Sequence, residues 1–173
     1  MNILSLRRRS GLAVLGLLLV AAAASAEAGA TGPAQVESFN AQGWSALRAQ
    51  VERQRRPALV VFSATWCSVC PGHIQSLAAD ARRQRHGVPL WVVLTDAAPG
   101  EADARLLATP HLRLADRVLG FDAPEAALRH AVDPRWRGMV PHIAWLAPGA
   151  APEFVAGLPD AQRLTRWLGR PQP

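Results

Sequence analysis

The stretch FSATWCSVCPGHIQSL, residues 62–77, contains both cysteines of the 173-residue chain. Cys67 and Cys70 are separated by two residues, and Ile74 and Leu77 follow them at the spacing of an amphipathic helix. Side chains at positions i and i+3 of a helix have Cβ atoms about 5–6 Å apart, so a disulfide between them closes and opens with a small adjustment. The stretch therefore predicts a C-x-x-C dithiol that cycles between thiol and disulfide.

The helix predicted behind the cysteines gives the two thiols different roles. If the helix starts at Cys67, unpaired backbone N–H groups and the positive end of the helix dipole stabilise a thiolate there. We therefore expect Cys67 to be the exposed nucleophile. Cys70, one turn inside the helix, is expected to be the more buried thiol, which attacks the mixed disulfide and releases the partner. Pro71 suits a first turn, where no intrahelical N–H bond is lost.

The segments on either side of this stretch alternate between helical and strand patterns. Apolar runs without polar alternation are typical of strands that are buried on both faces. The expected strands are residues 58–62, 90–94, a more peripheral one at 113–121, 143–146, and a short edge strand at 153–156. The expected helices surround residues 44–51, 74–81, 101–108 and 124–132, with a last one capped by Asp160. This order predicts an α/β domain with a central sheet and helices on both sides.

Two segments of the chain resemble the thioredoxin superfamily. ALVVFSATWCSVC, residues 58–70, is similar to that family's active-site region, and GMVPHIAWL, residues 138–146, is similar to its cis-proline segment. The resemblance extends over residues 36–168. The 73 residues between Cys67 and Pro141 exceed what a minimal thioredoxin needs, and the surplus, residues 101–132, resembles the central insertion of secreted bacterial TlpA-like proteins.

This resemblance implies a fold and an activity. The implied fold is a thioredoxin fold with a central mixed β-sheet flanked by helices, and with an insertion between the C-x-x-C helix and the cis-proline strand. The implied activity is thiol:disulfide exchange with protein disulfides, without a cofactor or a resident metal. A reductase is the first choice, with a role in cytochrome c maturation or copper-site assembly. A reductase in an oxidising compartment also needs a membrane thiol donor, so such a partner is implied as well.

The resemblance further implies which residues meet a substrate. Pro141 would be cis and lie beside the two sulfurs, where the backbone N–H and C=O of Val140 could pair with an extended substrate chain. A trans proline that opens a strand is the alternative. Trp66 would shield the sulfurs and offer an apolar docking face, and a tryptophan of the core is the alternative. His142 is expected to fill a strand position, with electrostatic tuning of the site as the alternative. The segment at residues 135–137, Arg-Trp-Arg, would rim the same surface.

Two positions depart from the family pattern. Val61 lies six residues before Cys67, where thioredoxins often have a buried acid that helps to move the proton of the resolving cysteine. Asp96, at the carboxyl end of a predicted central strand, is the candidate for proton transfer in its place, against an ordinary turn residue at a strand end. The dipeptide Ser68-Val69 matches neither the Gly-Pro of thioredoxin nor the Pro-His of strongly oxidising periplasmic proteins, so the redox direction stays open.

The N-terminus has the three parts of a secretory signal peptide. Three arginines at residues 7–9 precede an uncharged apolar run at 11–24, and residues 24–26, Ala-Ser-Ala, form a small-x-small cleavage pattern. The run is shorter than the roughly 20 residues that span a bilayer, so a retained membrane anchor is the weaker alternative. We expect a cleaved signal peptide at residues 1–26, a flexible tether at 27–35 and a thioredoxin-like domain at 36–170, located in the periplasm.

The charge of the chain indicates no nucleic-acid partner. The formal net charge of +6 falls to +3 without residues 1–26, which contain three arginines and no acid. All 19 basic residues are arginines, and they are scattered among acids rather than gathered into a basic stripe. The expected partners are therefore proteins that carry disulfides or dithiols.

Other interpretations of the cysteine pair compete with the reductase. A permanent structural disulfide is disfavoured because closing so short a loop removes little entropy from the unfolded chain. Haem attachment is excluded because C-x-x-C-H requires a histidine where the chain has Pro71. A Cu(I)-binding metallochaperone is the main alternative, since thiolates suit Cu(I) and His73 follows Cys70 by three residues. A thiol oxidant with the same dithiol is the other alternative.

Overall fold

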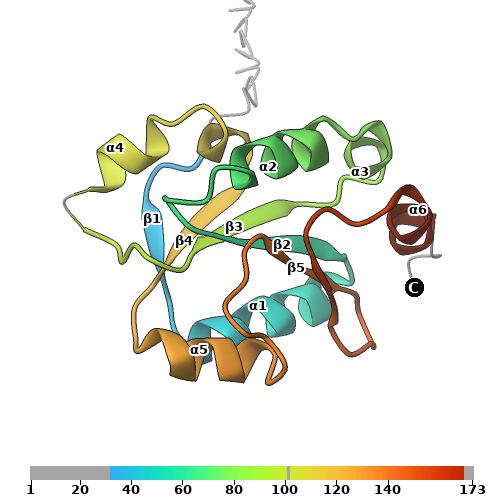
Figure 1. Cartoon of the computed structure of the whole chain (residues 1–173). Helices are drawn as coiled ribbons and strands as arrows, with labels where there is room; N and C mark the ends of the chain where they lie inside the picture. Colours follow the sequence, from blue (N-terminus) through green and yellow to red (C-terminus); the bar gives the residue numbers. More distant parts are fainter. Residues whose placement is uncertain (1–31, 101, 170–173) are drawn as a thin grey trace, which may run out of the picture.

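Six strands form one mixed sheet in the computed structural model, which describes residues 32–100 and 102–169 (Figure 1). The strands are β1 (Val36–Phe39), β2 (Ala58–Ser63), β3 (Leu90–Leu94), β4 (Arg117–Phe121), β5 (His142–Leu146) and β6 (Glu153–Ala156). Their order in the sheet is β1-β4-β3-β2-β5-β6. The first four in this order run parallel, whereas β5 is antiparallel to both β2 and β6.

Helices cover both faces of the sheet because the strands present apolar side chains on both faces. Every residue of β2, β3 and β5 is buried, as the unbroken apolar runs predict. One face packs against α1 (Ala41–Gln54) and α5 (Glu125–Val132). The other face packs against α2 (Cys70–Ala79), the 3-10 helix η1 (Leu112–Leu114) and α6 (Ala161–Gly169), with α3 (Ala81–Arg85) and α4 (Asp103–Leu107) beside them (Figure 1). The predicted α/β class is confirmed.

This topology is a thioredoxin fold to which the insertion adds one strand. Residues 101–132 contain α4, η1, β4 and α5, so the predicted helix, strand and helix are confirmed. The prediction that the strand at 113–121 is peripheral is wrong, because β4 lies between β1 and β3. The sheet edge next to β4 is formed by β1, a four-residue strand that sequence reasoning missed. Gly120 interrupts the apolar pattern of β4 because a Cβ there would collide with the carbonyl oxygen of Ala97.

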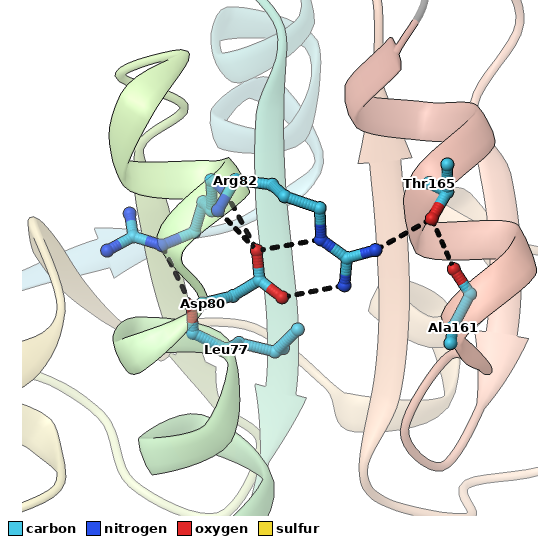
Figure 2. Close-up of polar contacts among 6 residues, drawn as sticks. Leu77, Asp80, Arg82, Ala161 and Thr165 are labelled. Atoms are coloured by element: carbon cyan, nitrogen blue, oxygen red, sulfur yellow. Dashed lines mark hydrogen bonds and ion pairs between the residues drawn. The ribbon is translucent and has the colours of Figure 1, made fainter.

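Asp80 divides the helical segment after the cysteines into two helices. The pattern predicts one helix through residues 74–81, but α2 ends at Ala79 and α3 begins at Ala81. The Asp80 carboxylate accepts hydrogen bonds from the backbone N–H groups of Arg82 and Arg83, at 2.9 and 3.0 Å, and so caps α3. It also pairs at 2.8 Å with the Arg82 guanidinium, which donates to Thr165 of α6 (Figure 2). One carboxylate thus connects the junction of α2 and α3 to α6.

The predicted signal peptide, part of the predicted tether and the predicted end of the domain lie outside the described residues. These are residues 1–26, residues 27–31 and residue 170. Residues 32–35, which belong to the predicted tether, contain no helix or strand. Among the helices of residues 32–100 and 102–169, none has the length and apolar character needed to cross a membrane.

Candidate active site

Cys67 and Cys70 are joined by a disulfide where the chain passes from β2 into α2. Their Cα atoms lie 5.5 Å apart. Cys67 lies in a turn, in which its N–H donates to the carbonyl oxygen of Ala64 at 3.1 Å. The helix begins at Cys70 rather than at Cys67, so the predicted helix start is wrong by one turn. Residues 68 and 69 form a bend that leads into the helix, and Pro71 occupies its first turn.

Cys70 is more deeply buried than Cys67, as predicted, but both residues are covered. Cys70 is fully buried, whereas Cys67 keeps 7% of its surface exposed. Ala64 packs with the two cysteines in a small apolar cluster, and Val140 lies against it. The prediction that Cys70 is the more buried of the two is therefore confirmed, whereas the prediction that Cys67 is exposed is wrong for the disulfide form, in which Cys67 is buried as well.

The cis-proline segment lies beside the disulfide, although it is distant in sequence. The peptide bond between Val140 and Pro141 is cis. The carbonyl oxygen of Val140 lies 3.9 Å from Cys67 Sγ. The carbonyl of Pro141 already accepts a hydrogen bond at 2.8 Å from the N–H of Gly157, the residue after β6. The N–H of Val140, by contrast, has no hydrogen-bond partner within the described part of the chain, which leaves it available to an extended peptide.

Three exposed apolar side chains flank the disulfide in the chain, and we call Trp66, Val69 and Met139 the apolar rim. Their exposed fractions are 70%, 55% and 66%. Trp66 precedes Cys67, Val69 precedes Cys70, and Met139 precedes Val140. The alternative in which Trp66 belongs to the core is wrong. Sequence reasoning did not single out Val69 or Met139, because exposure of an apolar residue leaves no mark in a local pattern.

Asp96 lies at the carboxyl edge of the sheet, next to the active-site turn. It follows β3, and Thr65 follows the parallel neighbour β2. Both carboxylate oxygens accept the Thr65 N–H, at 3.0 and 2.9 Å, and Oδ2 also accepts the Thr65 hydroxyl at 2.5 Å. Asp96 is exposed, and its hydrogen bonds go to the residue two positions before Cys67 rather than to either sulfur. The structure thus shows that Asp96 holds the turn that precedes Cys67.

Val61 is fully buried beneath α2, in the cluster that contains Ile74 and Leu77. No acid is present at this position, as the sequence indicates. The buried polar side chains of the described residues are Ser63, Thr95, Asp133 and His142. Sequence reasoning missed Asp133, and the only signal for it is its place between a predicted helix and Pro134.

The segment at residues 135–137 does not form a uniform rim. Arg135 and Arg137 are exposed, but Trp136 is buried with 7% exposure. Its indole N–H donates to the carbonyl oxygen of Met139 at 2.8 Å. Trp136 therefore braces the loop from inside, and only the arginines face solvent.

The residues that could assist metal binding are few. Within residues 32–100 and 102–169, no group of three or more histidine, cysteine, aspartate or glutamate side chains is placed to hold an ion. His73 is half-buried, and its Nδ1 is covered and lacks a hydrogen-bond partner in the described part of the chain. His73 and the two cysteines therefore do not form such a group.

Comparisons with known proteins find similar solved structures, whereas no family model and no curated protein matches the chain. A secreted Mycobacterium tuberculosis disulfide oxidoreductase homologous to E. coli DsbE is 17% identical, with 70% of this chain and 84% of that chain covered and a TM-score of 0.48. MTB DsbF, in its mixed oxidized and reduced forms, is 17% identical over 66% and 79% of the two chains, with a TM-score of 0.44. A thio-disulfide isomerase from Thermus thermophilus is 22% identical over 65% and 76%, with a TM-score of 0.44.

Proposed function

We propose that this protein is a thiol:disulfide oxidoreductase that exchanges electrons with protein disulfides through Cys67 and Cys70. The observation that carries the proposal is the meeting of a closed C-x-x-C disulfide with the backbone of Val140, whose N–H is unpaired within the described residues. A structural disulfide would not require an open peptide-binding edge beside it. The combination instead suits a site where a substrate chain is held while its sulfur reacts.

In the reducing direction, the exchange takes two substitutions at sulfur. The Cys67 thiolate attacks one sulfur of the target disulfide, the target S–S bond breaks, and the leaving thiolate takes a proton. Cys70 then loses its proton and attacks Cys67 Sγ, which breaks the mixed disulfide and releases the second target thiol. The target gains two electrons and two protons, and the Cys67–Cys70 disulfide remains. We propose Asp96 for transfer of the Cys70 proton, through solvent near the Thr65 turn, because the apolar Val61 lies at the usual place of the acid.

Substrate docking would use the backbone of Val140 and the apolar rim. An extended peptide that adds to Val140 places its own cysteine beside Cys67, since the Val140 carbonyl is 3.9 Å from that sulfur. The exposed Trp66 and Met139 would cover apolar side chains of the peptide. A locally unfolded protein disulfide therefore suits the site better than one buried in a folded domain.

The direction and location we propose are those of a periplasmic reductase. The support is the signal-peptide pattern at residues 1–26 and the helix, strand and helix at 101–132, which resembles the insertion of secreted TlpA-like proteins. Re-reduction by a membrane thiol carrier follows from this location. Sequencing the N-terminus of the exported protein should find residue 27 or 29 first, whereas an intact residue 1 would point to a retained anchor.

The proposal is tested with three forms of the protein. Reduced wild type should reduce a peptide disulfide stoichiometrically, and Cys67→Ser should abolish this. Cys70→Ser is the matched control, because it keeps the nucleophile and should accumulate a mixed disulfide that mass spectrometry detects. Full activity in Cys67→Ser contradicts the mechanism. The reduction potential should lie between about −270 and −120 mV, and a value below about −300 mV would indicate a structural bridge.

Cu(I) binding is the second candidate function, favoured by the covered, unpaired Nδ1 of His73 three residues after Cys70. Reduced protein should then hold one Cu(I) in competition with a chelator, and His73→Ala should weaken this binding while Cys67→Ser abolishes it. Failure of the reduced wild type to retain Cu(I) ends this hypothesis without affecting the oxidoreductase.

A further inference from the structure

His142 follows the cis-proline, and its imidazole is enclosed by aromatic rings. The residue begins β5 and pairs with Phe62 of β2. Its ring lies between those of Trp136 and Phe154, with centroid distances of 4.7 and 5.3 Å and interplanar angles of 10° on both sides. Only 6% of the residue is exposed. A flat ring suffices for such a stack, so the two nitrogens need a separate explanation.

One of these nitrogens lies beside a buried carboxylate. His142 Nε2 is 3.5 Å from Asp133 Oδ2, and Asp133 is 5% exposed. Nε2 makes no hydrogen bond with any described residue, so the two groups are close without being aligned. The other carboxylate oxygen accepts the backbone N–H of Arg135 at 3.0 Å and lies 3.3 Å from its guanidinium. Asp133 thus holds the start of a loop and stands beside the ring.

This loop, residues 133–141, connects the imidazole to the disulfide, and we call it the cis-proline loop. The Trp136 ring stacks on His142, and the backbone N–H of Trp136 donates to the carbonyl oxygen of Asp133 at 2.9 Å. The Trp136 indole holds the carbonyl of Met139 at 2.8 Å. The next residue is Val140, whose carbonyl lies 3.9 Å from Cys67 Sγ. A movement of Asp133 or Trp136 relative to the ring is therefore transmitted to the residues that we assign to substrate binding.

We propose that His142 is a positioning residue for substrate binding, whose protonation draws Asp133 toward the ring, displaces the cis-proline loop and weakens the binding of extended peptides. The inference rests on the proposed function and concerns the same site. The placement of Nε2 and Asp133, near but unaligned, suits a neutral ring. A charged ring is attracted to the carboxylate, and this attraction is strong because both groups are buried.

Among residues 32–100 and 102–169, the charged groups that face the ring come from the cis-proline loop. They are Asp133 and Arg135, since β2 and β6 present Phe62 and Phe154 to it. Burial lowers the pKa of His142 below its ordinary value of 6.5, Asp133 opposes this shift, and Arg135 adds slightly to it. The ring is therefore neutral at pH 7 and takes its proton on acidification.

Removing either of these two charges should shift the pH at which His142 is protonated, and the two shifts should have opposite signs. Asp133→Asn removes the group that favours the protonated ring, so protonation moves to lower pH. Arg135→Gln removes a repelling charge, so protonation moves to higher pH. This second shift is small because the Arg135 side chain is 84% exposed and screened by solvent.

The test compares two substrates between pH 5 and pH 7.5. One is an extended peptide in mixed disulfide with glutathione, and the other is hydroxyethyl disulfide, which is too small to pair with Val140. For wild type, the KM for the peptide should rise at least threefold as pH falls, and we call this rise the step. The kcat for the peptide should change much less, and the KM for hydroxyethyl disulfide should show no step. His142→Phe keeps a stacking ring and should remove the step. Asp133→Asn should move it to lower pH, and Arg135→Gln to higher pH.

Matched histidine controls separate the ring from general effects of acid. His130→Gln, on the exposed side of α5, and His111→Gln, before η1, should keep the step. A step that persists in His142→Phe, or shifts in the same direction in Asp133→Asn and Arg135→Gln, overturns the inference. If His142→Phe does not fold, the two loop variants decide alone. A flat peptide KM with normal turnover of hydroxyethyl disulfide refutes this inference only, whereas no turnover of either substrate refutes the proposed function beneath it.

Discussion

Replacing Asp80 with alanine should destabilise the oxidised domain by about 1.5 kcal/mol. The substitution removes the two hydrogen bonds that cap α3 and the ion pair with Arg82. An N-cap side chain is worth about 1 kcal/mol, and the pair adds only about 0.5 kcal/mol because the Arg82 side chain is 33% exposed. For a domain of this size, the loss corresponds to a fall in Tm of about 5 °C.

Asp80→Asn separates the cap from the charge. Asparagine keeps a side-chain oxygen for the backbone N–H groups of Arg82 and Arg83 and is as good an N-cap as aspartate. It lacks the charge opposite the Arg82 guanidinium. The expected loss is therefore about 0.5 kcal/mol, well below that of the alanine variant.

The effect should depend on pH with a definite sign. The hydrogen bond from the Arg82 side chain lowers the pKa of Asp80, with burial opposing and the Arg83 N–H assisting. A carboxyl whose folded-state pKa is depressed stabilises fully above its unfolded pKa, about 3.9, and loses this contribution as pH falls through the folded value. The stability difference between wild type and Asp80→Ala should thus be constant from pH 7 to pH 5 and narrow below about pH 4.

Urea unfolding of the oxidised proteins, followed by tryptophan fluorescence at pH 7 and pH 3, measures these differences. Asp160→Ala is the control, since Asp160 caps α6 through the N–H of Arg163 at 2.7 Å and makes no ion pair among the described residues. The free energy of unfolding of Asp160→Ala should fall by about 1 kcal/mol, a loss between those of the two Asp80 variants. The reasoning fails if Asp80→Ala matches wild type within about 0.3 kcal/mol, or if the difference is as large at pH 3 as at pH 7.

Other substitutions test the site and the core. Trp66→Ala should raise the KM for a peptide disulfide about 10-fold in steady-state kinetics, yet change stability by less than about 0.5 kcal/mol, because the side chain is 70% exposed. Asp96→Asn keeps an acceptor for Thr65 but cannot carry a proton, so stopped-flow resolution by Cys70 should slow at least about 10-fold; an unchanged rate would limit Asp96 to holding the turn. Trp167→Ala should cost about 3–5 kcal/mol in urea unfolding, because the side chain is fully buried, and a loss under about 1 kcal/mol contradicts this.

Features that depend on neighbours in the chain could be predicted from the sequence. The buried strands β2, β3 and β5 were predictable because unbroken apolar runs leave a local signal. The short spacing of Cys67 and Cys70 brought the two sulfurs within bonding distance, although across the bend at residues 68–69 rather than along a helical turn. The break of the following helix was less visible, because Asp80 caps α3 through contacts that an amphipathic pattern does not record.

Features that depend on long-range packing were decided only by the tertiary structure. The sequence by itself determined the dithiol and the α/β class, and its resemblance to the thioredoxin superfamily indicated the proline segment that would lie near the sulfurs. It did not determine that β1 takes the sheet edge from β4, nor that His142 meets Asp133 inside an aromatic stack. Both depend on pairing between distant segments, and a residue's own neighbours carry no information about the partner that covers it. The tertiary structure therefore decided what surrounds the two sulfurs, whereas the sequence decided where they are.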